Sequence, residues 1–468
     1  MQRYTLLQNC RLIDGVSPEP RDAASVLIEG ERITQVGGVD EVKPPPQGGG
    51  EVVDASGRTV MPGMVDCHFH GAYHDVSCFE DYDLRRPIEH TTILAARNAQ
   101  TLLEVGFTSA RDVGTRGLVA VALRDMIDQG VIKGPRMKPG ARILTTTGGL
   151  ADFYGNWADN QAALGHTVDG PAEILKATRL QIKYGVTNIK VEASGTGISP
   201  FASSTKQTMT EEEIATVVNE SKRNGVRVAC HAQATEGIKN GVRAGVTTIE
   251  HGSFLDEEGA DLMLAMGTVL VPTIAVLYLY VHKGPEVGVP DWVVQKFKGD
   301  LDLHYASVKM AREKGIPMVV GSDSGHAFNP QHVIAIELEL MVRLTDFTPM
   351  EAIQSATSVG ARTIGLGEVT GQITPGYYGD VLVVDGDPLA DVGILQQHHR
   401  LERVYKGGLL EAGTVARRAP QLELASVLER EPPIAGGALD PVPSRPHEEE
   451  PHAHRPSCLR HSEELENR

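Results

Sequence analysis

The chain has 468 residues and a formal net charge of −17. Such an excess of negative charge argues against nucleic acid or an anionic membrane as a partner. The length suits one large barrel with an accessory domain, or a few separate domains. The five cysteines are scattered and include no Cys-x-x-Cys pair, so we expect no disulfide framework and a reducing compartment. We find no signal peptide and no apolar run of membrane-spanning length, which favours a cytoplasmic protein.

Short strands separated by turns are expected at the start of the chain. The strand-like runs are 4–7, 10–13, 25–28 and 32–36. Asp14-Gly15 is a strong turn signal of the hairpin type. The Pro- and Gly-rich stretch from residue 43 to residue 50 then predicts a loop.

From residue 61 onward, strand-like and helix-like segments alternate. The strand-like segments are 63–70, 107–112, 142–144, 186–191, 226–231, 246–251, 268–271 and 316–321. The helix-like segments include 91–105, 119–127, 172–184, 257–265 and 291–314. Capping boxes at Thr210–Glu213 and Thr348–Glu351 mark two further helix starts. Strict alternation predicts an α/β protein with a parallel sheet, and eight strand units predict a (β/α)₈ TIM barrel over residues 61–368.

Short strands are expected again at 373–384 and 403–405. We therefore predict that residues 1–60 and 369–412 pair into a small β-sandwich domain beside the barrel. Residues 415–468 are rich in Pro, Glu, Arg and His and lack apolar periodicity, so we expect a disordered tail.

The first candidate site follows an apolar run, where His68 and His70 are separated by one residue. Residues i and i+2 of a strand point to the same side. The two imidazoles would then project together from the strand end, which suits two ligands of one metal ion. Taken alone, such a pair would more often be two surface histidines on an edge strand, and the partners downstream change this interpretation.

Four more residues stand at the ends of predicted strands. They are Lys190 in the fourth, His231 in the fifth, His251 in the sixth and Asp323 after the eighth. The carboxyl ends of barrel strands carry the active site of this architecture. With His68 and His70 they form a convergent set that is hard to explain by helix caps and core histidines.

Lys190 is unusual among these candidates, because an ammonium group among metal ligands would be repelled and its unpaired burial is unfavourable. Carboxylation by CO₂ would turn the same side chain into an anionic carbamate with one oxygen for each of two metals. The alternative is a salt bridge to Glu192, which lies on the same face of the strand.

These motifs resemble the amidohydrolase superfamily, and specifically its subtype with a carboxylated lysine and a binuclear metal centre. They are Asp66-Cys67-His68-Phe69-His70, Ile189-Lys190, Cys230-His231-Ala232, Glu250-His251-Gly252 and Gly321-Ser322-Asp323. The resemblance covers residues 1 to 412. It is nearest to the group of Xaa-Pro dipeptidases, carboxypeptidases and ochratoxinase-like enzymes, which is related to imidazolonepropionases.

The resemblance implies a role for each member of the set. His68, His70 and Asp323 bind one metal, His231 and His251 bind the other, and the carbamate of Lys190 bridges them. A metal-bridging hydroxide attacks the carbonyl carbon, and Asp323 passes its proton to the leaving amine. Two divalent ions are expected, with Zn²⁺ favoured by the His-rich ligands.

The loops beyond the strands supply candidate substrate-binding residues. They are Tyr73 and His74 after the first strand, Leu150 and Tyr154 after the third, Gln233 after the fifth and His326 after the eighth. Leu150 and Gln233 stand where many relatives carry histidine and tyrosine. Phe153, Tyr154 and Trp157 favour an aromatic wall for a ring-containing acyl group. Arg111 and Asp112 end the second strand and could bind substrate or form a structural ion pair.

We predict a metal-dependent hydrolase that releases a C-terminal amino acid from a dipeptide or an N-acyl amino acid. The alternative is a cyclic amide hydrolase or a deaminase acting on a heterocycle. Mononuclear deaminases of the superfamily carry Glu three residues after the fifth-strand histidine, where this chain has Ala234. A non-catalytic scaffold would have lost ligands, and none is lost here. The expected partners are a small-molecule amide and further copies of the chain in a homo-oligomer.

Overall fold

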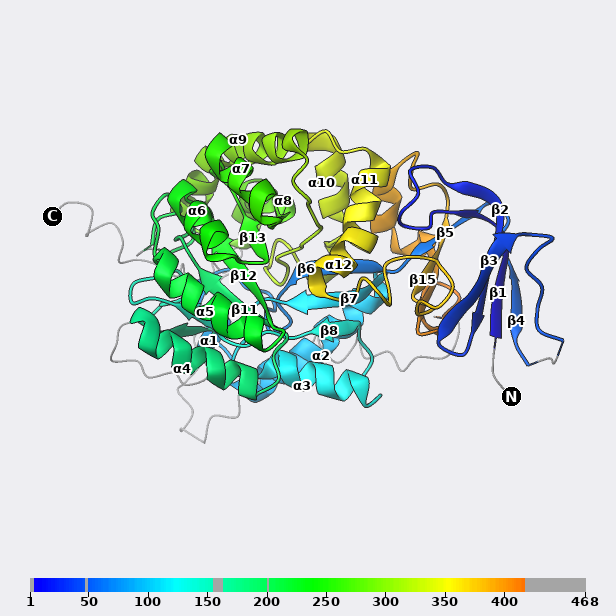
Figure 1. The fold of residues 1–468 in the computed structure, drawn as a ribbon, viewed down its shortest axis with the longest axis horizontal. Coiled ribbons are helices and arrows are strands. Elements are labelled where there is room, and N and C mark those ends of the chain that lie inside the picture. Colours follow the sequence, from blue (N-terminus) through cyan, green and yellow to red (C-terminus); the bar gives the residue numbers. More distant parts are fainter. Residues whose placement is uncertain (1–3, 47–48, 155–162, 200–201, 417–468) are drawn as a thin grey trace, which may run out of the picture.

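The computed structural model describes residues 4–46, 49–154, 163–199 and 202–416. These residues form an α/β body and a small sheet at one end of it (Figure 1). The predicted tail therefore lies almost wholly outside the described residues. Among the helices of the described part, none combines the length and apolar character needed to cross a bilayer.

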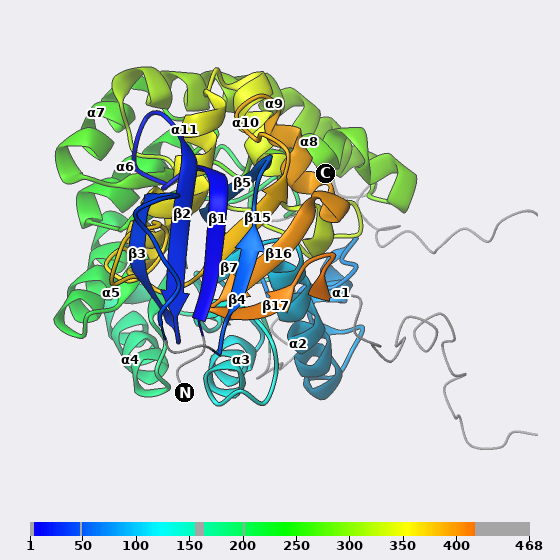
Figure 2. The ribbon, with the colours of Figure 1, turned by 90° about the vertical axis from the view of Figure 1, so that its right-hand side faces the viewer.

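The small sheet joins strands from both ends of the chain (Figure 2). Its members are β1 (Tyr4–Leu12), β2 (Arg21–Glu29), β3 (Arg32–Gly38), β4 (Glu51–Asp54), β5 (Arg58–Pro62), β15 (Val381–Asp385), β16 (Leu401–Lys406) and β17 (Leu409–Ala412). Strand β5 pairs in antiparallel fashion with β15, which brings the two ends together. The domain bounds at residues 60 and 369 stay predictions.

The predicted β-sandwich stays a prediction, because the strand pairing does not show whether the small domain has two layers. All eight strands belong to one sheet, which forks at β1. The first half of β1 pairs in parallel with β4, and its last residues pair with β5. The local strand pattern could not reveal this fork, because it depends on which distant strand each half of β1 meets.

Two parallel sheets form the centre of the larger body. The first contains β6 (Met64–Phe69), β7 (Phe107–Asp112) and β8 (Arg136–Lys138). The second contains β9 (Ile143–Thr145), β10 (Gly165–Thr167), β11 (Asn188–Glu192), β12 (Arg227–Ala232), β13 (Thr248–His251) and β14 (Val269–Val271). The expectation of an α/β protein with parallel strands is confirmed.

The predicted strand at 316–321 pairs irregularly, because Pro317 has no N–H to donate to a ladder. On one side the backbone N–H of Leu270 in β14 donates to Pro317 O over 2.9 Å. On the other side Cys67 N in β6 donates to Val320 O, also over 2.9 Å. This segment therefore links the second parallel sheet to the first.

Helices surround these strands in Figure 1. They are α1 (Phe79–Asp83), α2 (Ile88–Glu104), α3 (Val119–Asp128), α4 (Gly170–Lys183), α5 (Glu211–Arg223), α6 (Thr235–Ala244), α7 (Glu257–Met266), α8 (Ile274–His282), α9 (Asp291–Lys314), α10 (Ile336–Leu344), α11 (Pro349–Gln354) and α12 (Gly360–Ile364). Both predicted capping boxes are present at the starts of α5 and α11. Helix α8 was not predicted, because its sequence IAVLYLYVH is apolar on every face and shows no helical period.

The junction of the two parts contains a buried ion pair. Arg136 of β8 donates to both carboxylate oxygens of Asp380, over 2.7 and 3.0 Å. The same carboxylate accepts from Thr370 Oγ1 over 3.0 Å and from Gly407 N over 2.7 Å. Asp380 is 2% exposed, so its charge depends on these donors.

We expect Asp380→Ala to lower the free energy of unfolding by about 3 kcal/mol or more, because it leaves a half-buried guanidinium without its partner. Urea denaturation of the full chain would measure the change. Asp22→Ala is the control, because that side chain is 75% exposed in its pair with Arg11 and should matter by less than about 1 kcal/mol. Equal losses in the two variants would contradict this assignment.

Candidate metal centre

The six predicted metal-site residues meet in one cavity of about 610 Å³. His68 and His70 come from the end of β6, Lys190 from β11, His231 from β12, His251 from β13 and Asp323 from the segment that follows residue 321. Ligand atoms of His68, His251 and Asp323 all lie within 4.8 Å of one another. His70 Nε2 is 3.4 Å from Asp323 Oδ1.

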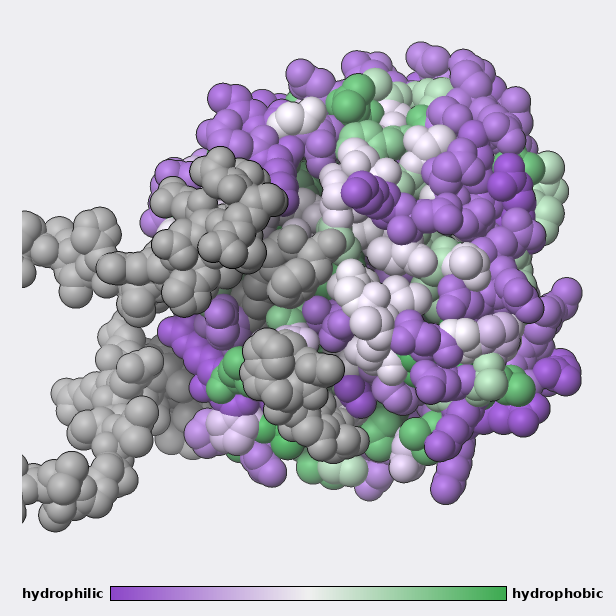
Figure 3. Space-filling model, turned by 90° about the vertical axis from the view of Figure 1, so that its left-hand side faces the viewer, coloured by the Kyte–Doolittle hydropathy of each residue, from purple (hydrophilic) through white to green (hydrophobic). Residues whose placement is uncertain are grey.

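The cavity lies at the carboxyl ends of the parallel strands. The rim of that face is largely hydrophilic, with less polar side chains toward its middle (Figure 3).

The four imidazoles lie side by side. The ring of His68 is 5.2 Å from those of His70 and His251, between centroids. His231 and His251 are closer, at 4.5 Å. All four rings are at least nine-tenths buried, so the pattern of two histidines on an exposed edge strand does not describe them.

Each imidazole has one nitrogen engaged by an acceptor in the surrounding protein. The contacts are His68 Nδ1 to Glu250 Oε2 (2.6 Å), His70 Nδ1 to Gly114 O (2.8 Å), His251 Nδ1 to Thr273 Oγ1 (2.6 Å) and His231 Nε2 to Gly195 O (3.1 Å). An N–H donated at one nitrogen leaves a lone pair at the other. The second nitrogen of every ring is thereby available to a metal ion, so the donor set fits one.

The protonation state of the imidazoles also favours metal binding. Burial lowers the pKa of His68 to about 4 and that of His231 to about 3. Burial also holds the pKa of His251 well below its usual range. These rings are neutral at physiological pH, which is the form that binds metal.

Two of the candidate ligands have strained backbones. His251 has φ of 70° and Asp323 has φ of 45°, in the left-handed region that residues other than glycine seldom adopt. Thr273, which engages His251, has φ of 50°. Such strain is of order 1–3 kcal/mol per residue and concentrates at functional sites. The backbone of Asp323 is held there by its N–H, which donates to His68 O over 2.8 Å.

Lys190 is 4% exposed and lies in the same cavity. Burial lowers the pKa of its ammonium group. No described carboxylate lies within ion-pair distance of it, including Glu192. Glu192 Oε2 accepts instead from Ala151 N over 3.1 Å. The salt bridge considered as an alternative is therefore not formed among the described residues.

Arg111 supports the site from inside the body and does not line the cavity. Its guanidinium donates to Glu250 Oε1 over 2.9 Å and to Cys67 O over 2.7 Å. Glu250 in turn accepts from His68, so a buried chain of charge-assisted bonds fixes that ring. Asp112 accepts from two backbone N–H groups beside β7 and does not pair with Arg111. Glu250 was a motif residue in the sequence, but only the structure shows its partners.

The predicted substrate-binding residues divide into two groups. Tyr73, Leu150, Gln233 and His326 line the cavity, whereas His74 and Tyr154 are not among its lining residues. Tyr73 stacks on His70 with centroids 4.1 Å apart. His74 Nδ1 faces Asn98 Oδ1 of α2 over 3.3 Å. The roles of all six stay predictions.

Aromatic residues complete the lining. Phe153 belongs to the predicted aromatic wall and lines the cavity, and Trp157 lies outside the described residues. Sequence analysis missed Tyr82 and Tyr280, which also line it. Tyr82 comes from the short helix α1 and Tyr280 from α8, neither of which the periodicity revealed.

Neutral imidazoles, a carboxylate and a lysine at the carboxyl ends of parallel strands define a metal-dependent hydrolase. The model of the amidohydrolase family matches residues 59–410, and the chain belongs to this family. It is therefore a hydrolase that acts on carbon–nitrogen bonds, and the resemblance of its motifs to the amidohydrolase superfamily is confirmed.

Comparison with individual proteins supports the same grouping. The chain is 30% identical to ochratoxinase of Aspergillus niger over 377 residues, which are 76% of each chain. It is 31% identical to a solved Xaa-Pro dipeptidase with bound methionine, with a TM-score of 0.79 over 87% of this chain and 99% of that one. A prolidase complexed with N-methylphosphonate-L-proline gives 30% identity and a TM-score of 0.80 over the same shares. Imidazolonepropionase of Hyphomonas neptunium is 22% identical over 86% of this chain and all of that one.

We expect Thr273→Val to weaken Zn²⁺ binding by about 10–100-fold, because the Nδ1–H of His251 loses the acceptor that fixes the ring. Competition with a chromogenic chelator would measure the affinity. Thr273→Ser keeps the hydroxyl and should retain most of the affinity. If the Ser and Val variants bind Zn²⁺ equally well, the hydroxyl does not position His251.

Proposed function

We propose that this amidohydrolase releases a C-terminal amino acid from a dipeptide or an N-acyl amino acid. The observation that carries the proposal is the set of four imidazoles, each with one nitrogen left available, around Asp323 in a single cavity. Relatives that share about 30% of their residues with this chain include a Xaa-Pro dipeptidase and a prolidase. The first was solved with methionine bound in its active site and the second with N-methylphosphonate-L-proline, so each of these two structures holds an amino acid or an amino acid derivative.

We infer that the two parallel sheets are arcs of one closed (β/α)₈ barrel. The irregular segment at 316–321 bridges β14 and β6 on one side of the ring. On the other side, the segment after β8 continues into β9, and Thr115 N donates to Ala141 O over 3.1 Å. A closed barrel would bring all six candidate residues to one mouth, as the cavity requires.

Two divalent ions fit this donor set, with Zn²⁺ favoured by imidazole nitrogens. His68, His70 and Asp323 would hold one, and His231 and His251 the other. Bound there, the ions would polarise the substrate carbonyl and make a water molecule nucleophilic.

Lys190 would link the two halves of the site as a carbamate. The neutral amine adds its lone pair to the carbon of CO₂, forms an N–C bond and releases one proton. The product is an anion with two oxygens, which removes the problem of an ammonium buried without a counterion.

Asp323 would move the proton during hydrolysis. Burial alone raises the pKa of its carboxyl, but the facing imidazoles of His68 and His70 outweigh burial and hold that pKa well below its usual range. The low pKa means that Asp323 is ionised, which is the form that would accept a proton from water and then deliver it to the departing amine nitrogen. Tyr73 and His326 flank this carboxylate in the cavity and would shape the space for the substrate.

The homo-oligomer expected from the sequence stays a prediction.

The decisive experiment is product analysis by mass spectrometry. The protein, supplied with Zn²⁺ and bicarbonate, would be incubated with dipeptides, N-acyl amino acids, cyclic amides and heterocyclic amines. We expect a free amino acid from the first two groups. Ammonia or a ring-opened product, without a free amino acid, would move the activity to the heterocycle branch.

We expect Lys190→Ala to lower kcat/KM by about 10³-fold or more and to lower the bound metal content, because the bridging anion is lost. Short carboxylic acids should restore part of the activity by occupying the vacated space. Lys183→Ala, on the exposed face of α4, should behave like the wild type. Full activity in Lys190→Ala would exclude the carbamate bridge.

A further inference from the structure

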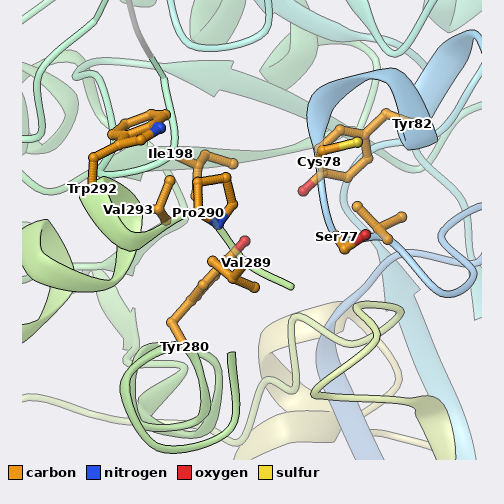
Figure 4. A pocket seen from close by; sticks show the side chains of 10 residues that line it. Ser77, Cys78, Tyr82, Ile198, Tyr280, Val289, Pro290, Trp292 and Val293 are labelled. Atoms are coloured by element: carbon orange, nitrogen blue, oxygen red, sulfur yellow. The ribbon is translucent and has the colours of Figure 1, made fainter. Parts of the chain in front are cut away.

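A second cavity of about 380 Å³ adjoins the metal cavity (Figure 4). We call it the side compartment. Its lining residues are Val76, Ser77, Cys78, Tyr82, Ile198, Tyr280, Val289, Pro290, Trp292 and Val293. They come from the segment after β6, the segment after β11 and the α8–α9 region. Not one of these ten lining residues has a charged side chain.

The side compartment and the metal cavity share a wall. Tyr82, Ile198 and Tyr280 line both of them. The Tyr82 hydroxyl lies 3.0 Å from His326 Nε2, and His326 Nδ1 lies 3.1 Å from Asp323 O. In Figure 4 the hydroxyl oxygens of Tyr82 and Tyr280 lie between the two sides of the compartment, and the contact of Tyr82 with His326 connects this wall to the metal cavity.

The wall is rigid. Tyr280 stacks on Phe297 of α9 with centroids 4.4 Å apart and an interplanar angle of 20°. Tyr82 stacks on Phe153 with centroids 5.5 Å apart and an angle of 9°. A group held in the side compartment would keep a fixed direction relative to the metal ligands, because both supporting rings are packed on a second aromatic ring.

One polar group in the side compartment lacks a partner. The indole nitrogen of Trp292 is buried and makes no hydrogen bond with any described residue. In Figure 4 this nitrogen lies on the edge of the ring that faces the neighbouring side chain of Ile198, another lining residue of the compartment. A buried donor without an acceptor is unfavourable and is satisfied when a ligand supplies an oxygen.

We propose that the side compartment binds a large aromatic group of the substrate that carries an oxygen acceptor for Trp292. This inference rests on the proposed function, since the scissile amide must lie beside Asp323 and the neighbouring space then receives a substituent of that amide. An uncharged aromatic ring matches the apolar lining, and a charged side chain would lose its hydration without compensation. The preferred amides are therefore those with a hydroxyphenyl or similar ring next to the scissile bond.

The compartment can be filled by mutation at Val293, which is 4% exposed and lines it without lining the metal cavity. We expect Val293→Phe to lower kcat/KM by at least about tenfold for dipeptides and N-acyl amino acids with an aromatic ring, and by less than about twofold for Gly and Ala analogues. Leu303→Phe, on the same helix but 55% exposed, should change neither. A uniform loss across the panel, or no loss, would overturn the proposal.

The unpaired indole nitrogen of Trp292 predicts a second, independent effect, which is the ratio of kcat/KM between Tyr substrates and their Phe analogues. We expect substrates with Tyr to exceed their Phe analogues in kcat/KM by about 2–10-fold, the range of one hydrogen bond between neutral groups. Trp292→Phe should bring that ratio to about one while leaving Gly and Ala substrates unaffected. A ratio that survives in Trp292→Phe would show that the indole does not recognise the oxygen.

Binding can be tested without turnover. The chain has two tryptophans, so a Trp157→Phe background leaves Trp292 as the single fluorophore of its kind. Benzyl alcohol, an uncharged ring with an oxygen, should change this fluorescence in a saturable manner, and Val293→Phe should abolish the effect. No saturable change would overturn the inference even if amino acids are released. Failure of every amide in the panel, with normal benzyl alcohol binding, would overturn only the proposed function.

Discussion

Burial of ionisable side chains that need a partner is the constraint on which the rest of this structure depends. The imidazoles, the carboxylate and the lysine of the candidate metal centre are removed from bulk water, and buried polar groups are stable only when they are paired. The hydrogen-bond acceptor differs from ring to ring. It is a carboxylate for His68, a hydroxyl for His251 and a backbone carbonyl for His70 and His231. Each acceptor belongs to a different strand or loop, so the site exists only when the parallel strands are in register.

The pattern of alternating segments predicted much of this framework, because it reflects local properties. The bounds of β7 and α9 match the expected segments, and the candidate ligands stand at strand ends as expected. Burial on both faces of a parallel strand produces continuous apolar runs, which are visible in one sequence. The position of a residue at the end of such a run then determines which side of the sheet it reaches.

The features that could not be predicted depend on contacts between distant residues. Arg111 and Glu250 are adjacent only because β7 and β13 face each other inside the body. His74 closely follows the candidate ligands His68 and His70, yet Asn98 of α2 engages it and it does not line the cavity. Tyr280 lies on a helix that is apolar all round, so no period marked its presence. Local sequence therefore located the candidate ligands that meet in one cavity, while the other residues that line this cavity were found only in the structure.

The pairing of β5 with β15 has a consequence for synthesis of the chain. Pro62 and Val381 are partners in this antiparallel ladder, yet the whole larger body is encoded between them. At translation rates of about 5–20 residues per second, the first strands leave the ribosome on the order of tens of seconds before their partner. During that interval β5 has an unsatisfied edge, the kind that invites pairing with other chains. The edge of β5 that pairs with β15 therefore stays open until β15 has been synthesised. During this interval the parallel strands of the larger body, which lie between them in the sequence, can assemble.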